Sequence, residues 1–433
     1  MNAEYIGRVN QLSRIGCRTI SWLAGARSHL LLSCLICSCV VTPFAAFGQV
    51  GIPVPMPRVD VPPPAISFAP WRQVDQTDEV TEFVEEFPST VVTAYPENNV
   101  VPLRVFVPAN VSGPIPIVLV LHYWGATDIR NERALAQELT RAHIATAVMT
   151  LPYHLARTPP GHRSGDMAIQ PDPASLVSTM TQAVLDARRS LDFLDTRPEF
   201  DHSRVGIAGT SLGAVVAELA YAVDSRVTKA TFILGGVNLA HIVWSSSLLV
   251  QQRDLLRRKG YTEEKLSEAI KSIEPLEYFS TRKPTSSFVI AGLYDTVIPK
   301  QSAEELIESL SSPKVLWLDT GHYGGIFVQR RLMREVGKYF QIEFRGATFA
   351  APKNLYAPTI RLGVKVDTGN GFDIGVGLDL IKFDKRGDGF TSLFLTPRGP
   401  QLFVGKTIYP AVSVGVIGST HSVGIGLLWS AVL

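Results

Sequence analysis

A single serine stands between two glycines in the segment VGIAGTSLGAVVAELA, residues 205–220. An apolar run precedes Gly-Thr-Ser-Leu-Gly, and a helix-forming run follows it. A serine in a sharp strand-to-helix turn is exposed for nucleophilic attack, and the glycines avoid clashes that larger residues would cause. The pattern makes Ser211 a candidate nucleophile. It also places the backbone N–H of Leu212 at a helix N-terminus, where it can stabilise an oxyanion.

A serine nucleophile needs a base, and the base needs an acid that orients it. The segment VIAGLYDTVIP places Asp295 directly after an apolar run, and VLWLDTGHYGG places His322 after the next one. The order Ser211, Asp295, His322, with each residue at the end of a predicted strand, predicts a catalytic triad. Asp319 is the alternative acid, and an ordinary turn or surface role is the alternative for each of the three residues.

The elements that must position these residues alternate between strand-like and helix-like segments. Short apolar, β-branched runs are typical of parallel strands that are buried on both faces. The clearest helix spans 172–195, where Asp172 can cap the helix and Pro173 occupies its first turn. The pattern predicts a mostly parallel sheet with helices on both faces. The strand-like runs lie at 116–122, 144–151, 204–209, 227–236, 286–292 and 314–319.

These motifs resemble those of α/β-hydrolases. The loops GLYDTVIP and GHYGG are similar to those of the dienelactone-hydrolase-like and acyl-esterase branches. The resemblance covers residues 79–343 and implies an eight-stranded sheet, a covalent acyl-enzyme, and neither a cofactor nor a metal. Dienelactone hydrolases use a cysteine nucleophile, so the serine here shifts the expected chemistry towards ester hydrolysis.

The loop LHYWGAT differs from the resembled family, because Tyr123 stands where a glycine usually follows the histidine. The second oxyanion N–H is expected from Tyr123 or Trp124, and His122 is expected to shape the loop rather than to act as a base. A second loop, 151–167, carries Arg157 and Arg163, which are candidates for gripping a carboxylate or carbonyl of the substrate. Salt bridges in a solvated loop are the alternative role for these arginines.

Two further segments have their own character. Residues 246–273 hold two amphipathic helical stretches broken at Gly260, which suit either a cap over the active site or ordinary crossover helices. Residues 346–433 alternate with period two between turn-forming clusters, so they predict a small antiparallel β-domain of about six strands. Glycines alternating with apolar residues are also typical of outer-membrane barrels. Six strands are expected to be too few for a closed monomeric barrel, and the chain does not end in an aromatic residue. We therefore expect a sheet packed on itself or on the hydrolase domain, with membrane or surface association as the alternative.

The N-terminal residues indicate export. A basic stretch ending at Arg27 precedes the apolar run HLLLSCLICSCVV, and small residues near Gly48 suit cleavage, so 1–48 is predicted to be a signal peptide. All four cysteines lie in this segment, so the exported chain would hold no disulfide. Residues 49–78 are rich in proline and predict an extended arm or linker.

Charge and composition narrow the function further. The chain has 41 Lys and Arg against 39 Asp and Glu, and no basic stripe indicates a nucleic-acid partner. The sequence therefore predicts an exported, periplasmic or secreted serine hydrolase that cleaves a small-molecule or polymer-linked carboxylic ester. The alternatives are a serine peptidase or amidase, and a non-catalytic binding or surface-anchoring protein.

Overall fold

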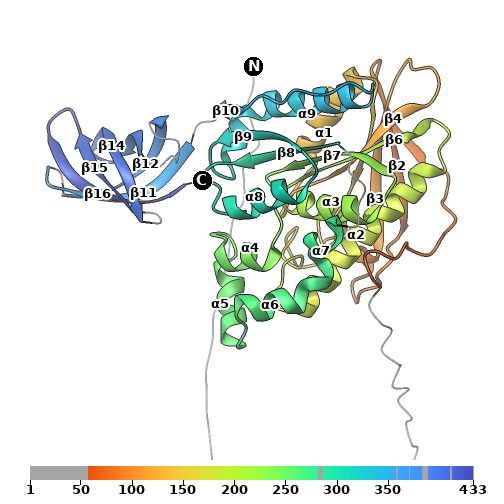
Figure 1. Cartoon of the computed structure of the whole chain (residues 1–433), viewed down its shortest axis with the longest axis horizontal. Helices are drawn as coiled ribbons and strands as arrows, with labels where there is room; N and C mark the ends of the chain where they lie inside the picture. The colour runs from red at the N-terminus through yellow and green to blue at the C-terminus, as the bar shows by residue number, and fades with distance from the viewer. Residues whose placement is uncertain are drawn as a thin grey trace, which may run out of the picture. The chain divides into compact units, whose positions relative to one another are not determined.

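The computed structural model describes residues 57–280, 286–356, 359–369, 371–382, 389–409 and 412–432. The predicted signal peptide and the first residues of the proline-rich arm lie outside these ranges. None of the helices in these ranges combines the length and hydropathy needed to cross a bilayer. The described chain forms an α/β domain and a C-terminal β-barrel (Figure 1).

The α/β domain is built on a ten-stranded sheet in the order β1-β2-β3-β5-β4-β6-β7-β8-β9-β10. Strands β1, β2, β3 and β5 pair antiparallel in that order, and the pairs from β5 to β10 are parallel. Strands β2 to β9 make up the predicted eight-stranded sheet, and β1 and β10 extend it at its two edges, so the predicted fold class is confirmed. The strands span Arg72–Gln76 (β1), Val80–Pro88 (β2), Val100–Pro108 (β3), Ile115–Leu121 (β4), Ala145–Met149 (β5), Phe200–Thr210 (β6), Val227–Ile233 (β7), Ser286–Gly292 (β8), Lys314–Asp319 (β9) and Asn354–Tyr356 (β10).

The two edge strands lie outside the predicted range of the hydrolase domain, 79–343, because β1 precedes this range and β10 follows it. β1 has the sequence RQVDQ and is exposed throughout, so no apolar pattern marks it as a strand. β10 has three residues and forms by parallel pairing with β9. Strands of this kind are defined by their neighbours in the sheet, and local sequence does not reveal them.

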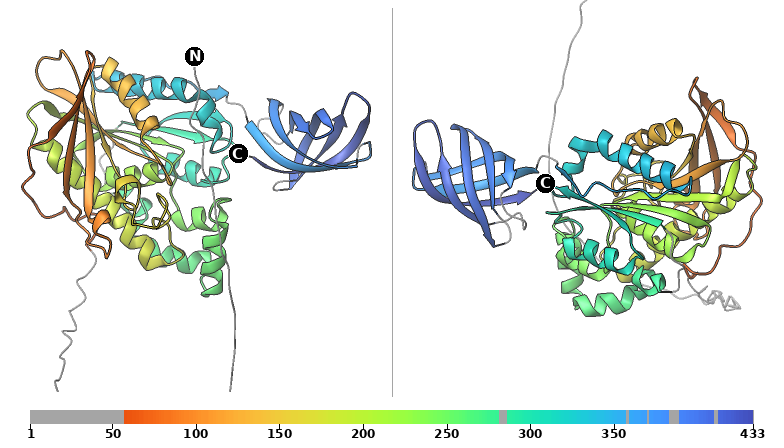
Figure 2. Two further views of the ribbon diagram at one scale, coloured as in Figure 1. Left: turned by 180° about the vertical axis from the view of Figure 1, so that it is seen from behind. Right: turned by 45° about the horizontal axis from the view of Figure 1, so that its top comes forward.

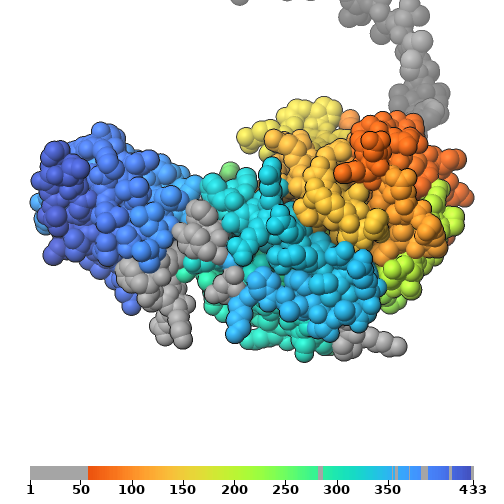
Figure 3. Space-filling model, turned by 90° about the horizontal axis from the view of Figure 1, so that it is seen from above, coloured from red at the N-terminus to blue at the C-terminus, as the bar shows by residue number. Residues whose placement is uncertain are grey.

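Helices cover both faces of this sheet, as predicted (Figure 2). Helices α1 and α9 pack on one face and form the surface seen in Figure 3. Helices α2 and α3 pack on the other face. Helix α2 begins as predicted, with the Asp172 carboxylate accepting the N–H of Ser175 and with proline at its first position. The helices span Arg130–Arg141 (α1), Pro173–Asp195 (α2), Leu212–Val223 (α3), Leu239–Ser245 (α4), Val250–Arg258 (α5), Glu263–Ile270 (α6), Leu276–Phe279 (α7), Lys300–Ser309 (α8) and Gln329–Glu343 (α9).

The insertion after β7 folds as two short helices, α5 and α6, which separate at Gly260 as the sequence predicts. Gly260 has a φ of +82°, a conformation that favours glycine at a helix end. The apolar faces of these helices bury Leu256 and Leu266 in the core on the α2 and α3 side of the sheet. Helices α4 to α6 thus add a layer beside the carboxyl edge of the parallel strands.

The C-terminal domain is a closed barrel of six antiparallel strands, β11 to β16, in which β16 pairs with β11. The expectation that six strands are too few to close is therefore wrong. Inward glycines make the small radius possible: a Cβ on Gly377 would lie 2.6 Å from the ring of Phe394, and one on Gly405 would lie 2.6 Å from the ring of Phe403. The strands span Thr359–Asp367 (β11), Gly371–Lys382 (β12), Gly389–Thr396 (β13), Gly399–Tyr409 (β14), Val412–Gly418 (β15) and Val423–Val432 (β16).

Candidate active site

Ser211 occupies a strained turn between β6 and α3. Its backbone has φ +54° and ψ −117°, an unusual conformation for a residue other than glycine. The turn is so tight that a Cβ on Gly209 would lie 2.0 Å from the carbonyl oxygen of Gly213. A Cβ on Gly213 would lie 2.3 Å from the carbonyl oxygen of Leu121, at the end of β4. Both glycines of the motif are thus required by backbone contacts, and the turn presents the serine at the carboxyl edge of the sheet.

The three residues of the predicted triad are hydrogen-bonded in series. His322 Nε2 lies 2.9 Å from Ser211 Oγ, and His322 Nδ1 lies 2.7 Å from Asp295 Oδ2. The other oxygen of Asp295 accepts the backbone N–H groups of Val297 and Ile298 at 2.8 and 2.9 Å. These bonds fix the carboxylate, which leaves Oδ2 directed at the imidazole.

The choice between the two candidate acids follows from these contacts. Asp295, in the loop after β8, makes the hydrogen bond to His322, whereas Asp319 is the last residue of β9. With Nδ1 donating to Asp295, the neutral imidazole carries its lone pair on Nε2, facing the Ser211 hydroxyl. This tautomer is the one that a general base for the serine requires.

The loop after β4 approaches Ser211 from the other side. His122 Nδ1–H donates to the carbonyl oxygen of Tyr123 at 2.9 Å. In a planar trans peptide the carbonyl and the following N–H point in opposite directions, so the N–H of Trp124 points away from His122. The N–H of Leu212, the first residue of α3, has no acceptor within its helix. The hydrogen bond from His122 to the Tyr123 carbonyl therefore favours the N–H of Trp124, rather than that of Tyr123, as the second oxyanion donor beside Leu212.

Two buried histidines hold this loop in place. His122 Nε2 accepts the N–H of Leu151 at 3.0 Å, and His154 Nε2 accepts the N–H of Gly125 at 3.0 Å. Burial lowers the pKa of His122 to about 3 and the pKa of His154 to about 4. Both rings are therefore neutral near neutral pH. His122 shapes the loop, in agreement with the expectation from sequence.

The loop 151–167 also holds the loop after β4 in place through hydrogen bonds. The indole N–H of Trp124 donates to the carbonyl oxygen of Gly165 at 2.8 Å, and the hydroxyl of Ser164 donates to the carbonyl oxygen of Ala126. Together with His154, these bonds connect the two loops at three points. The sequence marked 151–167 as a segment near the pocket but did not reveal this supporting role, because the partners are 29 to 41 positions apart.

Arg157, a candidate substrate residue, lies in a different environment from the one predicted. Its side chain is fully buried, and its Nη2 pairs with Asp186 Oδ2 at 2.8 Å. The guanidinium also donates to the carbonyl oxygens of Asn98 and Thr150. Its donors are thus directed into the protein interior, so a substrate-binding role for Arg157 is wrong. Arg163 is exposed, pairs with Asp166 at 3.4 Å, and does not line the cavities beside Ser211.

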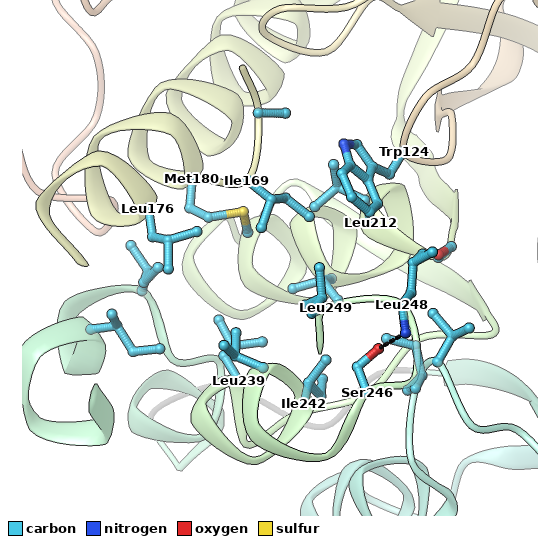
Figure 4. Close-up of a pocket in the computed structure, with 18 residues that line it drawn as sticks. Trp124, Ile169, Leu176, Met180, Leu212, Leu239, Ile242, Ser246, Leu248 and Leu249 are labelled. Atoms are coloured by element: carbon cyan, nitrogen blue, oxygen red, sulfur yellow. Dashed lines mark hydrogen bonds between the residues drawn. The ribbon is translucent and has the colours of Figure 1, made fainter. Parts of the chain in front are cut away.

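Two cavities meet at Ser211, Trp124 and Leu248. The first has a volume of about 100 Å³ and is enclosed by helices α2, α3, α4 and α6 and the segments beside them (Figure 4). Its wall is apolar except for the hydroxyls of Ser211 and Ser246, and Ser246 Oγ already accepts the N–H of Leu248 at 3.2 Å. The side chains that shape it include Ile169, Leu176, Met180, Leu239, Ile242 and Leu249.

The second cavity, of about 270 Å³, lies on the His322 side of the serine. Tyr123, Tyr323 and Ile326 contribute to its wall, and Tyr323 and Ile326 are largely exposed at its rim. Neither cavity could be predicted from the sequence, because their walls come from many separate segments and no local pattern marks them. No group of three or more metal-ligating side chains occurs in the part of the chain that the structure describes.

Comparison with known proteins agrees with this fold. Residues 160–324, which include Ser211, Asp295 and His322, match the family model for serine hydrolase (FSH1). The acetyl xylan esterase from Paenibacillus sp. R4 is similar in structure, with a TM-score of 0.50 and 20% identity, over 62% of this chain and 88% of that chain. Acetyl xylan esterase 1 from Thermoanaerobacterium sp. JW/SL YS485 has a TM-score of 0.47 and 16% identity, over 61% of this chain and 87% of that chain. No curated protein sequence matches the chain significantly. The likeness to the first structure supports the predicted α/β-hydrolase fold, and the family match supports the predicted serine hydrolase.

The buried ion pair between Arg157 and Asp186 is expected to contribute strongly to the stability of the fold. Replacing Asp186 by alanine leaves the buried Arg157 guanidinium without its carboxylate, and we expect the free energy of unfolding to fall by about 3–5 kcal/mol. The matched control is Asp166→Ala, which removes the surface partner of Arg163 and is expected to cost less than about 1 kcal/mol. Urea unfolding followed by circular dichroism measures both. Equal effects of the two substitutions would contradict a structural role for the buried pair.

The neutral histidines predict a pH dependence. Because the folded-state pKa of His154 lies at about 4, below its unfolded value of 6.5, its stabilising effect is complete above pH 6.5 and declines as the pH falls towards 4. We compare the wild type with His154→Gln, whose amide oxygen can accept the same N–H but does not titrate. Between pH 7 and pH 4 the wild type is expected to lose on the order of 3 kcal/mol more stability than the variant. Parallel pH curves in denaturant melts would rule this out.

Proposed function

We propose that this serine hydrolase of the α/β-hydrolase fold cleaves carboxylic esters that carry an apolar acyl group. The observation that carries the proposal is the hydrogen-bonded series from Ser211 through His322 to Asp295, at a turn that faces two cavities. A binding protein has no need of a base bonded to a serine in a strained turn, so this series favours a catalytic function over a non-catalytic one.

The first half of the reaction forms an acyl-enzyme. His322 Nε2 takes the proton from Ser211 Oγ as this oxygen attacks the ester carbonyl carbon. The N–H groups of Leu212 and Trp124 bind the negative oxygen of the tetrahedral intermediate. Asp295 stabilises the imidazolium that has formed. His322 then gives its proton to the alkoxide oxygen, the alcohol leaves, and the acyl group remains on Ser211.

The second half releases the acid. A water molecule gives a proton to His322 Nε2 and attacks the acyl carbonyl carbon, and the same two N–H groups bind the oxyanion again. When the intermediate collapses, the bond to Ser211 Oγ breaks and this oxygen regains the proton from His322. The residues return to their starting states, and one water has been consumed for each ester cleaved.

The apolar cavity supports the choice of acyl group. A chain that extends from the carbonyl between Leu249, Met180 and Ile242 exchanges water for apolar contacts, which is worth about 0.8 kcal/mol for each methylene buried. The wall offers no unpaired charge to bind a polar or ionised acyl group. The second cavity, beside His322, is then left for the alcohol, because His322 must protonate that oxygen.

Export is part of this proposal, and the N-terminal sequence supports it. The basic stretch up to Arg27, the short apolar run and the small residues near Gly48 are typical of a cleaved signal peptide. N-terminal sequencing of the protein recovered from outside the cytoplasm would test it, and an uncleaved chain retained in the cytoplasm would contradict it.

Substitution of the nucleophile tests the catalytic function directly. We expect Ser211→Ala to lower kcat for p-nitrophenyl esters by at least 10³-fold, because no acyl-enzyme can form. The same substitution should abolish labelling by a fluorophosphonate. The exposed Ser203→Ala variant is the control and should behave as the wild type. Undiminished labelling of Ser211→Ala would show that the reactive serine lies elsewhere, and a matching panel of p-nitroanilides separates esterase from amidase activity.

Narrowing the apolar cavity tests the acyl group. Met180→Trp adds bulk to the cavity wall and is expected to lower kcat/KM for p-nitrophenyl octanoate at least tenfold, while the value for the acetate changes less than threefold. Leu276→Trp, at a partly exposed position outside the cavity, is the matched control. An equal loss with both esters would mean that the cavity does not hold the acyl chain.

A further inference from the structure

The barrel strands alternate in polarity in the sense opposite to that of a soluble domain. On β11, the side chains of Arg361, Lys365 and Asp367 are buried inside the barrel. The apolar side chains between them point outward, and two of them, Leu362 and Val366, are about half exposed. Because successive side chains of a strand point to opposite faces, one face of this strand is charged and the other is apolar.

Four of the buried charged side chains inside the barrel form two ion pairs, and a fifth, Asp373, accepts a hydrogen bond from Gln401. Arg361 Nε donates to Asp379 Oδ1 at 2.8 Å, and its guanidinium lies 3.7 Å from the centre of the Phe390 ring. Lys365 pairs with Asp367 on the same strand. Buried charges are costly unless they are paired in this way. The polar groups therefore belong to the interior, and a different register between β11 and β12 would separate Arg361 from Asp379.

The outer face is apolar around the whole circumference of the barrel. Each of the six strands contributes at least one large exposed hydrophobic side chain, and Trp429 is 64% exposed. Among the outward-facing strand positions whose side chains the structure describes, Lys406 is the one charged residue. One example from each strand is Leu362, Ile374, Leu395, Val404, Val416 and Leu427.

Water is a poor solvent for such a surface, since soluble proteins seldom expose a contiguous apolar patch of more than a few hundred Å². A partner protein covers one side of a domain, whereas here the apolar residues form a complete belt. Four of the six strands have suitable lengths: β11, β12, β14 and β16 have 9, 12, 11 and 10 residues, close to the 9–11 residues that a tilted membrane strand needs, whereas β13 and β15 are shorter, with 8 and 7 residues. A closed barrel leaves no unpaired edge, so its backbone groups are satisfied without water.

We propose that this barrel lies in a lipid bilayer, with its outer face against the acyl chains and its paired charges inside. β11 begins three residues after β10 ends, so the barrel would hold the catalytic domain at the membrane surface. This inference rests on the burial pattern of the barrel and does not depend on the proposed esterase activity.

Reconstitution of the full chain with phosphatidylcholine liposomes tests the proposal. We expect the wild type to float with the liposomes in a sucrose gradient. The double variant Leu378→Lys/Leu427→Lys places two charges on the outer face, and its floating fraction is expected to fall at least tenfold. Val92→Lys, at an 81% exposed position of the catalytic domain, adds a charge elsewhere and should float as the wild type does.

A second measurement keeps the test independent of the folding of the double variant. Brominated lipids quench a tryptophan that contacts acyl chains, so the liposome-bound wild type should lose more fluorescence than the variant Trp429→Phe. Equal quenching of the two proteins would overturn the proposal. A wild type that remains in the aqueous fractions would also overturn it, and a defined oligomer there, with Trp429 shielded from iodide, would identify a second copy as the occupant of the apolar face.

Discussion

The close backbone contact between Gly209 and Gly213 is the constraint on which the active site depends. It allows β6 to turn directly into α3, with only Ser211 between the last strand residue and the first helical residue. The serine is forced into a positive φ, and the first N–H groups of α3 are directed to the same side as its hydroxyl. Nucleophile and oxyanion donor are thus products of one turn. A side chain at either glycine would separate them, because backbone atoms already occupy that space.

Three histidines around this turn have different environments and therefore different tasks. His322 has a carboxylate on one side and a hydroxyl on the other, so gaining a proton at Nε2 produces a cation that Asp295 stabilises. His122 and His154 have backbone carbonyls as acceptors for their own N–H, and their Nε2 atoms accept backbone N–H groups. A second proton on either ring would sit on Nε2, opposite a backbone N–H donor, and the resulting cation would be buried away from water. Burial thus makes two histidines rigid parts of the scaffold, and a paired carboxylate makes the third a base.

The sequence predicts those features that are determined by local chemistry. The glycine-serine-glycine turn and the cap of α2 at Asp172 each depend on a few neighbouring residues. The triad residues are 27 and 111 positions apart, but each follows a recognisable apolar run, so their order could be predicted. The role of Arg157 could not be predicted in this way, since its partner Asp186 lies 29 positions away on α2. The cavity walls could not be predicted from local sequence either, because Leu176, Ile242 and Leu249 meet only when three separate segments pack together.

The barrel shows a different limit of sequence reasoning. Period-two alternation was visible and correctly predicted antiparallel strands, but alternation has two faces and does not say which of them is inside. The sequence therefore predicted a sheet packed on itself or on the hydrolase domain, with membrane or surface association as the alternative. Closure of the barrel at a small radius determines which face lies inside. The inward glycines leave room for Phe390, Phe394 and Phe403 together with the ion pairs. The branched side chains then point outward. One chain therefore contains two domains of opposite polarity, and the physical consequence is that the same solvent cannot suit the outer surfaces of both.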